Sequence, residues 1–393
     1  MGKRGNPWLI KVWCAISILL ASSLTPSYGT SMEIDGPYKV GAIFAVTGRA
    51  SYVGEPEKKT VEMIAGEINK AGGINGHPLE LTIYDDEGDA TKCMAAMKKL
   101  INEDNVSVVI GPSTSGTSLA VIGLAEKAQI PMISCAANKR IVMPVEQRYW
   151  VFKVAGSDMY VAQRIFAHMK GRGIGKVAIM TDTTGFGASG REELLAWAPR
   201  FGISIVADER YGPKEIDLTA QLTKIQETEA QAIVNWSAGY TQVVAVRGWR
   251  SLGMDNLPLY QSHGFGSRMY IELCGKDAEG VLCPLSGVNI GRLLPDSYVQ
   301  KGVIMDYTRA YEKGQNAPVS PFGGHAWDAL HIAVAALEAV GPDRAKIRDF
   351  IENLTGFVGQ HGVFNFSPTD HNGLSKDDLE MVIVKGGVWA IAK

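Results

Sequence analysis

Residues 61–86, VEMIAGEINKAGGINGHPLELTIYDD, decide the fold, because they pass from an amphipathic helix through a glycine-rich break into an apolar strand. In the first part Val61, Ile64 and Ile68 recur at the spacing of one helical face. The glycines of AGGING end that helix, and LELTIYDD then has the composition of a strand. Since an apolar run at 38–45 precedes the helix, the fold begins with a strand–helix–strand unit.

The same alternation continues along most of the chain, in two rounds. Short apolar strands joined by helices of about 10–15 residues predict parallel sheets with helices on both faces. The expected fold class is therefore α/β, with two doubly wound parallel-sheet lobes. The first round has expected strands at 38–45, 79–86, 107–112, 131–137 and 151–157, and helices at 60–69, 90–103 and 117–129. The second has helices at 159–170, 191–202, 217–228 and 242–252, and strands at 176–182, 203–209, 230–238, 257–263 and 279–285.

The remainder of the chain, from about residue 287, is too short to form a third lobe. Its pieces must complete the two lobes, so we expect the chain to cross between them more than once. Both expected domains are then discontinuous. Expected helices lie near 295–314, 323–340 and 343–354, with a hairpin at 380–392. The expected domains are an N-terminal lobe of 38–156 plus 287–372 and a C-terminal lobe of 157–286 plus 373–393.

The first 29 residues have the composition of a secretory signal. Lys3, Arg4 and Lys11 precede an apolar run at 12–24, and small residues follow up to Gly29. The run is short for a membrane-spanning helix, which needs about 20 apolar residues, so an uncleaved anchor is the less favoured alternative. We therefore expect a signal peptide over 1–29 and an exported mature protein.

Composition limits the choice of partners. The 393 residues hold 39 Lys and Arg against 41 Asp and Glu, a formal net charge of −2 at pH 7. A protein that binds nucleic acid usually has a basic face, and this balance gives no sign of one. Hydrophobic residues make up 46%, as in an ordinary folded protein. Nucleic acid is therefore not an expected partner.

Four cysteines follow the leader, and sequence alone does not fix their pairing. Cys274 and Cys283 enclose the turn-rich GKDAEG, and an oxidising compartment would permit a disulfide between them. Buried free thiols are an equally compatible interpretation. The chain contains no CxxC, and Asp85 and Asp86 end a strand without an evident third ligand, so no metal site is expected.

Gly185, Gly187 and Gly190 form a literal GxGxxG between an expected strand and an expected helix. Asp208 and Glu209 follow at about the spacing of the dinucleotide fingerprint, so the alternative function is an oxidoreductase that uses NAD. That alternative is disfavoured, because TDTT separates the strand from the first glycine and the unit opens the second lobe rather than the first. Export would also take the protein away from the nicotinamide pool. No cofactor is expected.

A hydroxyl-rich turn at residues 113–116, STSG, follows a strand and opens a helix. Free N–H groups at such a helix start suit an anion such as a carboxylate, although plain capping explains the same residues. In the second round Phe186, Tyr240 and His263 stand just after strands, at the sheet edge where open α/β folds bind ligands.

Five segments, taken together, resemble a known family. The chain is similar to the periplasmic substrate-binding proteins of branched-chain amino-acid ABC transporters, the type I, leucine-binding-protein-like fold. The likeness implies two α/β lobes joined by a three-stranded hinge, which close on a small molecule. It also implies a periplasmic, monomeric protein that delivers its ligand to membrane permease subunits without catalysis. The segments are EINKAGGINGHPLELTIYDDEGDATK at 67–92, VVIGPSTSG at 108–116, IPMISCAAN at 130–138, VFKVAGSD at 151–158 and HAWDALHIAVAALEAVG at 325–341.

The resemblance also implies ligand contacts. The first lobe would bind the ligand carboxylate through a turn and the strand end beside it, where Asn138 stands in place of the threonine usual in amino-acid binders. The implied carboxylate contacts are Thr114, Ser115, Ala136 and Asn138, with Tyr52 or Val53 covering the ligand, Phe186 in an aromatic-Gly turn, and Tyr240 as a second-lobe contact.

One departure from the family concerns the ligand ammonium. Amino-acid binders carry an acid after the strand that corresponds to LPLYQS, whereas here residues 261–264 read QSHG. A buried ammonium needs a carboxylate partner, and His263 cannot supply a negative charge. We therefore expect carboxylates without an α-ammonium, aromatic acids among them, to bind better than leucine or valine, unless another acid of the second lobe meets the ammonium. A ligand-sensing domain on the same fold is a further alternative function.

Overall fold

The computed structural model describes residues 36–392, so the signal expected over 1–29 lies outside the described residues. The first sheet has five strands in the order β2-β1-β3-β4-β5, and every neighbouring pair is parallel. This is the sheet expected from the first round of the sequence pattern. Its strands are β1 (Tyr38–Phe44), β2 (Leu79–Asp85), β3 (Val108–Ile110), β4 (Met132–Ser134) and β5 (Val151–Lys153).

The second sheet has seven strands in the order β14-β13-β10-β9-β8-β6-β7. The five from β6 to β10 are parallel, and the C-terminal hairpin adds β13 antiparallel to β10. The α/β fold with two parallel-sheet lobes is thus confirmed. The strands are β6 (Lys176–Asp182), β7 (Ser204–Tyr211), β8 (Ala232–Trp236), β9 (Leu259–Gln261), β10 (Leu282–Leu285), β13 (Glu380–Lys385) and β14 (Val388–Ile391); β11 (Phe357–Val358) and β12 (Val363–Phe364) pair separately.

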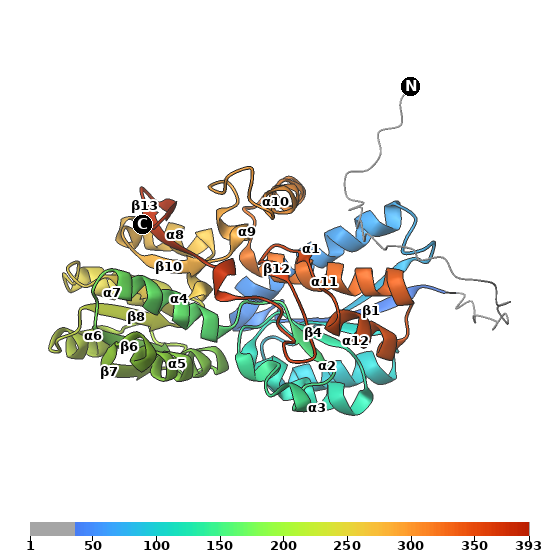
Figure 1. The fold of residues 1–393 in the computed structure, drawn as a ribbon, viewed down its shortest axis with the longest axis horizontal. Helices are drawn as coiled ribbons and strands as arrows, with labels where there is room; N and C mark the ends of the chain where they lie inside the picture. Colours follow the sequence, from blue (N-terminus) through green and yellow to red (C-terminus); the bar gives the residue numbers. More distant parts are fainter. Residues whose placement is uncertain (1–35, 393) are drawn as a thin grey trace, which may run out of the picture. The chain divides into compact units, whose positions relative to one another are not determined.

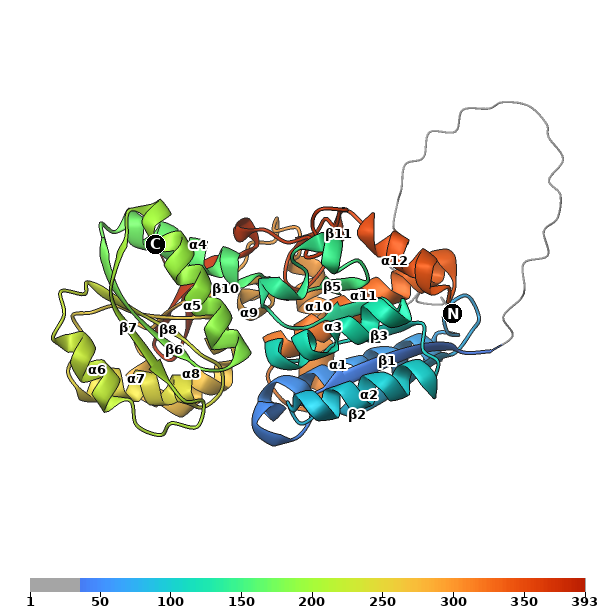
Figure 2. The same cartoon turned by 90° about the horizontal axis from the view of Figure 1, so that it is seen from below.

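Helices cover both faces of each sheet. In the first lobe α2 and α3 pack together on one face, while α1 and α11 lie side by side and contact the strands from the other (Figures 1 and 2). The helices are α1 (Ser51–Lys70), α2 (Ala90–Asn102), α3 (Ser115–Ala128), α4 (Asp158–Gly171), α5 (Gly185–Trp197), α6 (Thr219–Gln226), α7 (Thr241–Ser251), α8 (Arg268–Cys274), α9 (Gly287–Ile290), α10 (Lys301–Gln315), α11 (Pro321–Val340) and α12 (Arg344–Glu352). No helix among residues 36–392 is long and apolar enough to cross a membrane.

The second sheet is buried on both faces, as parallel strands require. Along β6 the side chains alternate: Val177 and Ile179 join a core with α4 and α5, whereas Ala178 and Met180 join a core with α6, α7 and α8. This alternation explains why the strand reads as a continuous apolar run rather than as an alternating one.

The chain passes between the sheets after β5, after β10 and before β13, and the first and last of these crossings are tied together. Lys153 donates its backbone N–H to the carbonyl of His371 at 3.0 Å. The Asn372 amide donates to the carbonyls of Lys153 and Ala155, at 3.3 and 3.1 Å. The ammonium of Lys153, wholly buried, donates to the carbonyls of Ala137 and Ala155 at 2.7 and 3.1 Å. The hinge is therefore held by buried polar contacts.

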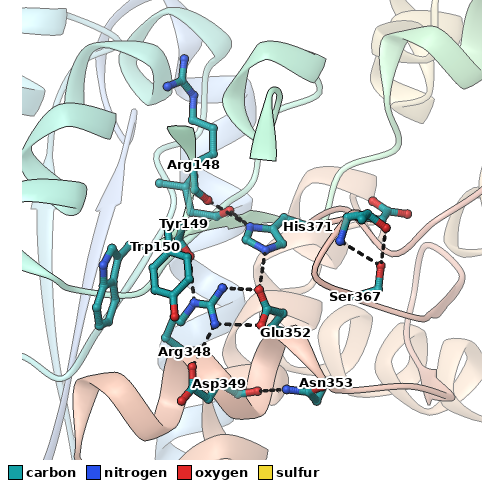
Figure 3. Close-up of polar contacts among 12 residues, drawn as sticks. Arg148, Tyr149, Trp150, Arg348, Asp349, Glu352, Asn353, Ser367 and His371 are labelled. Carbon is teal, nitrogen blue, oxygen red and sulfur yellow. Dashed lines mark hydrogen bonds and ion pairs between the residues drawn. The ribbon is translucent and has the colours of Figure 1, made fainter. Parts of the chain in front are cut away.

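A second polar cluster holds the segment before the last crossing on the first lobe (Figure 3). The guanidinium of Arg348 stacks over the ring of Tyr149, 3.4 Å from its centroid, and pairs with Glu352. His371 places Nε2 3.3 Å from the Glu352 carboxylate and Nδ1 3.0 Å from the carbonyl of Arg148. Helix α12 and the chain around His371 are thereby fixed against β5.

Two helices begin earlier than the sequence indicated, and of the two interpretations of the cysteines the structure has the free thiols. Helix α1 begins at Ser51 rather than near residue 60, and α5 begins at Gly185, so the three glycines of the motif lie inside it. The disulfide considered for Cys274 and Cys283 is wrong: both are buried free thiols, and the Cys283 sulfur lies 3.2 Å from the carbonyl of Ser262. Helices α8 and α9 and the β11–β12 pair were not predicted.

The GxGxxG motif is explained by close packing within the protein. A methyl group at Gly187 would overlap Asp182, and one at Gly190 would overlap the indole of Trp236. A methyl group at Gly185 would lie 3.2 Å from the backbone nitrogen of Gly116, which belongs to the other lobe. Each glycine therefore lets backbone approach a neighbour, and none is needed to hold a phosphate.

Replacing Gly190 with alanine should destabilise the protein by about 1–3 kcal/mol, the usual effect of overpacking a core. The added methyl must displace the Trp236 ring, which is fully buried. Urea unfolding of Gly190→Ala and of the control Gly171→Ala would measure this, because a methyl at Gly171 meets nothing within 4 Å in α4. Equal stability of the two variants would contradict the packing explanation.

Candidate functional site

A cavity of about 560 Å³ lies between the two lobes. Its wall is built mainly from the first residues of α1, α3, α5, α7 and α11 and from the loops that precede them. In a parallel sheet the helices begin at the carboxyl ends of the strands, so these helix starts gather at one place. Helix N-termini carry free N–H groups and partial positive charge, so a cavity bounded by several of them favours an anion.

The start of α3 is the best-defined polar part of the cavity. Thr114 is its N-cap: the side-chain oxygen accepts the N–H of Thr117 at 3.3 Å and lies 2.8 Å from the Thr117 hydroxyl. The backbone N–H groups of Ser115 and Gly116 belong to the first turn, where the helix itself offers them no acceptor. Thr114, Ser115 and Gly116 all line the cavity, so a carboxylate there would meet both hydroxyls and free N–H groups.

Buried hydrogen bonds position this turn. The Ser113 hydroxyl accepts the N–H of Ala45 at 3.0 Å and donates to the carboxyl of Glu57 on α1. Glu57 is wholly buried, and burial raises the pKa of its carboxyl well above the ordinary value. The turn that would hold the ligand is thus anchored to both β1 and α1.

The start of α5 meets the start of α3 from the other lobe. Thr184 is the N-cap of α5 and accepts the N–H of Gly187 at 3.2 Å, as Thr114 does for α3. Gly185 approaches Gly116 so closely that a methyl group on Gly185 would lie 3.2 Å from the Gly116 nitrogen, whereas one on Gly116 would meet nothing within 4 Å. Two helix N-termini from different lobes therefore face the same end of the cavity.

Aromatic rings form an apolar wall in the second lobe. Phe186 lies 5.3 Å from the His263 ring and 5.9 Å from the Trp236 ring, measured between centroids. From the first lobe Tyr52 packs edge-on against Tyr270 at 6.0 Å, and burial raises the pKa of its phenol above the ordinary value. A ligand with a carboxylate at the helix starts would place its apolar body among these rings.

The cavity brings together seven of the eight ligand contacts predicted from the sequence. Tyr240 lies at its exposed rim, with 53% of its surface accessible, and Val53, the alternative to Tyr52, also lines it. The sequence analysis did not predict several charged residues of the wall, among them Arg49, Asp182 and Asp378. It also did not predict His325 on α11 or His361 after β11. The predicted residues that line the cavity are Tyr52, Thr114, Ser115, Ala136, Phe186, Tyr240 and His263.

Asn138 is the exception, because it does not line the cavity. Its side-chain oxygen accepts the N–H of Arg140 at 2.8 Å, and its amide donates across the lobes to the carbonyl of Gly185 at 3.4 Å. The next two residues also reach the second lobe, because Lys139 pairs with the buried Glu193 and Arg140 pairs with Glu192 at 2.7 Å. This segment joins the lobes and does not contact the enclosed space.

His263 is neutral in the folded protein. Burial, together with the nearby charge of Lys153, lowers the pKa of its imidazole to about 3. Its Nε2 lies 4.0 Å from a carboxylate oxygen of Asp158, whose pKa burial raises to about 7. His263 thus offers the cavity hydrogen bonding and an aromatic edge, and no charge.

An acid does line the cavity in the second lobe, at the end of β6. Asp182 accepts the N–H of Thr184 at 2.9 Å, the Thr184 hydroxyl, and the N–H of Ala238 at 3.4 Å. Burial raises the pKa of this carboxyl, while these donors and the charge of Arg49 act in the opposite direction. The carboxylate oxygens of Asp182 therefore already accept several hydrogen bonds from the protein itself. Among residues 36–392 no group of three or more His, Cys, Asp or Glu side chains is arranged to hold a metal ion.

The family model for periplasmic binding proteins matches residues 37–386, and the chain belongs to this family. Among solved structures it is similar to an extracellular ligand-binding receptor from Rhodopseudomonas palustris, with 28% identity, a TM-score of 0.85, and coverage of 91% of this chain and 100% of that one. It is also similar to the branched-chain amino-acid transporter protein LivJ from Streptococcus pneumoniae, solved with isoleucine, with 25% identity, a TM-score of 0.77, and coverage of 91% and 99%.

Curated relatives lead to the same class. The Leu/Ile/Val-binding protein homolog 3 of Brucella melitensis is 23% identical over 90% of this chain and 94% of its own length. The leucine-, isoleucine-, valine-, threonine-, and alanine-binding protein of Pseudomonas aeruginosa is 23% identical over 91% and 92%. Both relatives are named as amino-acid-binding proteins, and LivJ is named as the substrate-binding protein of a branched-chain amino-acid transporter, the class that the sequence resembles.

Acid should destabilise the protein partly through His263. Its pKa is about 3 when folded against an ordinary 6.5, so between these values the unfolded chain binds a proton that the folded chain excludes. Stability is therefore fully present above pH 6.5 and falls as the pH drops towards 3. Asp158, with a pKa of about 7, is mostly protonated in that range and offers little charge to compensate.

Urea unfolding of the wild type and of His263→Gln at pH 7, 6, 5 and 4 would test this. The variant should lose less stability on acidification than the wild type, since glutamine takes up no proton. Parallel curves for the two proteins would show that His263 does not carry the effect.

Proposed function

We propose that the chain is an exported solute-binding protein that captures a small organic carboxylate between its two lobes and delivers it to the permease of an ABC transporter. In this proposal residues 1–29 are a signal peptide, the mature protein is a periplasmic monomer, and it catalyses no reaction. The observation that carries the proposal is the enclosed cavity at which the starts of α3 and α5 meet.

The same geometry supports a trap that closes on its ligand. An anion held at Thr114 and Ser115 lies close to the start of α5, so it interacts with both lobes at once. The ligand contacts the second lobe only when the two lobes meet. The binding energy of those contacts would therefore favour the closed arrangement. In the proposal one lobe is formed by residues 38–156 with 287–372, and the other by residues 157–286 with 373–393. Two separate sheets support this division: β1–β5 form the first, and β6–β10 with β13 and β14 form the second.

The side chains of the cavity support binding rather than catalysis. Cys135 lines the cavity, but burial raises the pKa of its thiol well above the ordinary value, so it is not a thiolate nucleophile. Thr114 is engaged with Thr117, and Ser113 is engaged with Glu57. Within residues 36–392 neither hydroxyl is hydrogen-bonded to a histidine, which is the arrangement that nucleophilic catalysis needs.

The proposal favours carboxylates that lack an α-ammonium. Asp182 is the acid best placed to meet an ammonium, and its oxygens already accept hydrogen bonds from Thr184 and Ala238. The second candidate is an amino acid, because the Pseudomonas aeruginosa relative is named for leucine, isoleucine and valine among its ligands and LivJ was solved with isoleucine. The two candidates differ in whether Asp182 contributes to affinity.

Calorimetry with leucine and with 4-methylpentanoate would separate these candidates, because the two differ only in the α-ammonium group. We expect 4-methylpentanoate to bind more tightly, and we expect Asp182→Asn to change the ratio of the two affinities by less than about threefold. Tighter binding of leucine, lost in Asp182→Asn, would establish the amino acid as the ligand class and Asp182 as its ammonium partner.

Replacing both Thr114 and Ser115 with alanine should weaken binding of 4-methylpentanoate or phenylacetate by about 10–100-fold, because two hydrogen bonds to a charged group are lost. The stability of the free protein should fall by only about 1 kcal/mol per lost cap. The control is Asp343→Ala, which removes the N-cap of α12 outside the cavity wall. Unchanged affinity in the double variant would assign the turn a structural role only.

Small-angle scattering of the wild type should show a smaller radius of gyration at saturating ligand than without ligand, because the proposal has the two lobes close on the solute. An unchanged radius of gyration would contradict this closure.

A further inference from the structure

His361 and Asp328 form a buried pair at the cavity wall, and neither residue belongs to the contacts described above. Asp328, on α11, accepts the N–H of Gln360 at 2.6 Å and the N–H of His361 at 3.2 Å. The same carboxylate lies 2.9 Å from Nδ1 of His361. His361 lines the cavity, and only 4% of its surface is accessible.

These contacts fix which nitrogen of His361 carries the proton. A carboxylate that already receives two backbone N–H groups is an acceptor, so Nδ1 must donate to Asp328. In the neutral ring Nε2 then has a lone pair and no proton. Nε2 is buried and has no hydrogen-bond partner among residues 36–392. A buried acceptor without a donor is unfavourable, and a bound molecule can supply the donor.

A second buried histidine lies against this acceptor. His325, also on the wall, stacks on His361 with the ring centroids 3.9 Å apart. Burial lowers the pKa of His325 well below its ordinary value. Charged groups on the wall are Arg49, Glu87, Asp182 and Asp378, three of them acids, so a second anion would be repelled.

We propose that Nε2 of His361 accepts a hydrogen bond from the bound solute, so that the solute carries a hydroxyl or amino donor in addition to the carboxylate held at α3. This inference rests on the proposed function, because it takes the carboxylate at Thr114 and Ser115 as given. It adds a second point of recognition, provided by the first lobe, that selects for a hydrogen-bond donor on the ligand and against a second carboxylate.

The test uses probes that differ only in the terminal group. Calorimetry would compare straight-chain carboxylates of four to eight carbons ending in a methyl, hydroxyl, amino or carboxylate group, together with 3-phenylpropanoate and 3-(4-hydroxyphenyl)propanoate. At the chain length that reaches His361, the hydroxyl or amino compound should bind about tenfold more tightly than its methyl counterpart, as one buried hydrogen bond allows. The dicarboxylate of that length should bind more weakly than either.

Variants separate recognition from structural support. His361→Asn places an amide where Nδ1 lies and keeps the donor to Asp328, but it removes Nε2, so the tenfold preference should disappear. His361→Gln can return an acceptor near the position of Nε2 and should restore part of the preference. The matched control is His331→Asn. His331 is on α11 with Asp328, stacks on Trp327, places Nδ1 2.9 Å from the Trp327 carbonyl, and does not line the cavity.

Each outcome decides between the two proposals. If monocarboxylates bind but the terminal donor makes no difference, or if the preference survives in His361→Asn, the inference about His361 is wrong while the proposed function stands. If the dicarboxylates bind best, the pair recognises an anion and the inference is likewise overturned. If no member of the series and no amino acid binds, the proposed function itself fails.

Discussion

The arrangement of this protein depends on the convergence of helix N-termini at one enclosed cavity. Parallel strands place every following helix start at the same sheet edge, and two sheets facing each other bring two such edges together. The cavity therefore has a positive electrostatic bias before any charged side chain is considered. The acids of the wall and His361, which is paired with Asp328, lie within this bias.

The lobes are joined by polar contacts and by the edge-on packing of Tyr52 against Tyr270. The buried ammonium of Lys153 stabilises the hinge, and Lys139 pairs with the buried Glu193 across the lobes. The exposed pair of Arg140 and Glu192 can separate into water with little penalty, whereas removing the partner of the buried Glu193 would be strongly unfavourable.

The sequence predicted the fold well because helices and strands alternate with clear periodicity and glycine breaks. It failed at the helix starts, since Gly185, Phe186 and Gly187 have weak helical preference and form the first turn of α5 only because Thr184 caps it. The site was predicted where it follows a strand directly, as at Thr114, Phe186 and His263. His325 and His361 were missed because they come from α11 and a turn far along the chain, and only tertiary packing brings them to the cavity. Asn138 was misplaced because a strand end alone does not show which way a side chain points.

The bare backbone contact between Gly185 and Gly116 gives the protein an adjustable affinity. A methyl group on Gly185 would act as a wedge at the seam between the lobes, beside Phe186 and the start of α3. Such a wedge would penalise every arrangement in which the two helix starts meet, so it would weaken the binding of any solute that is held between them.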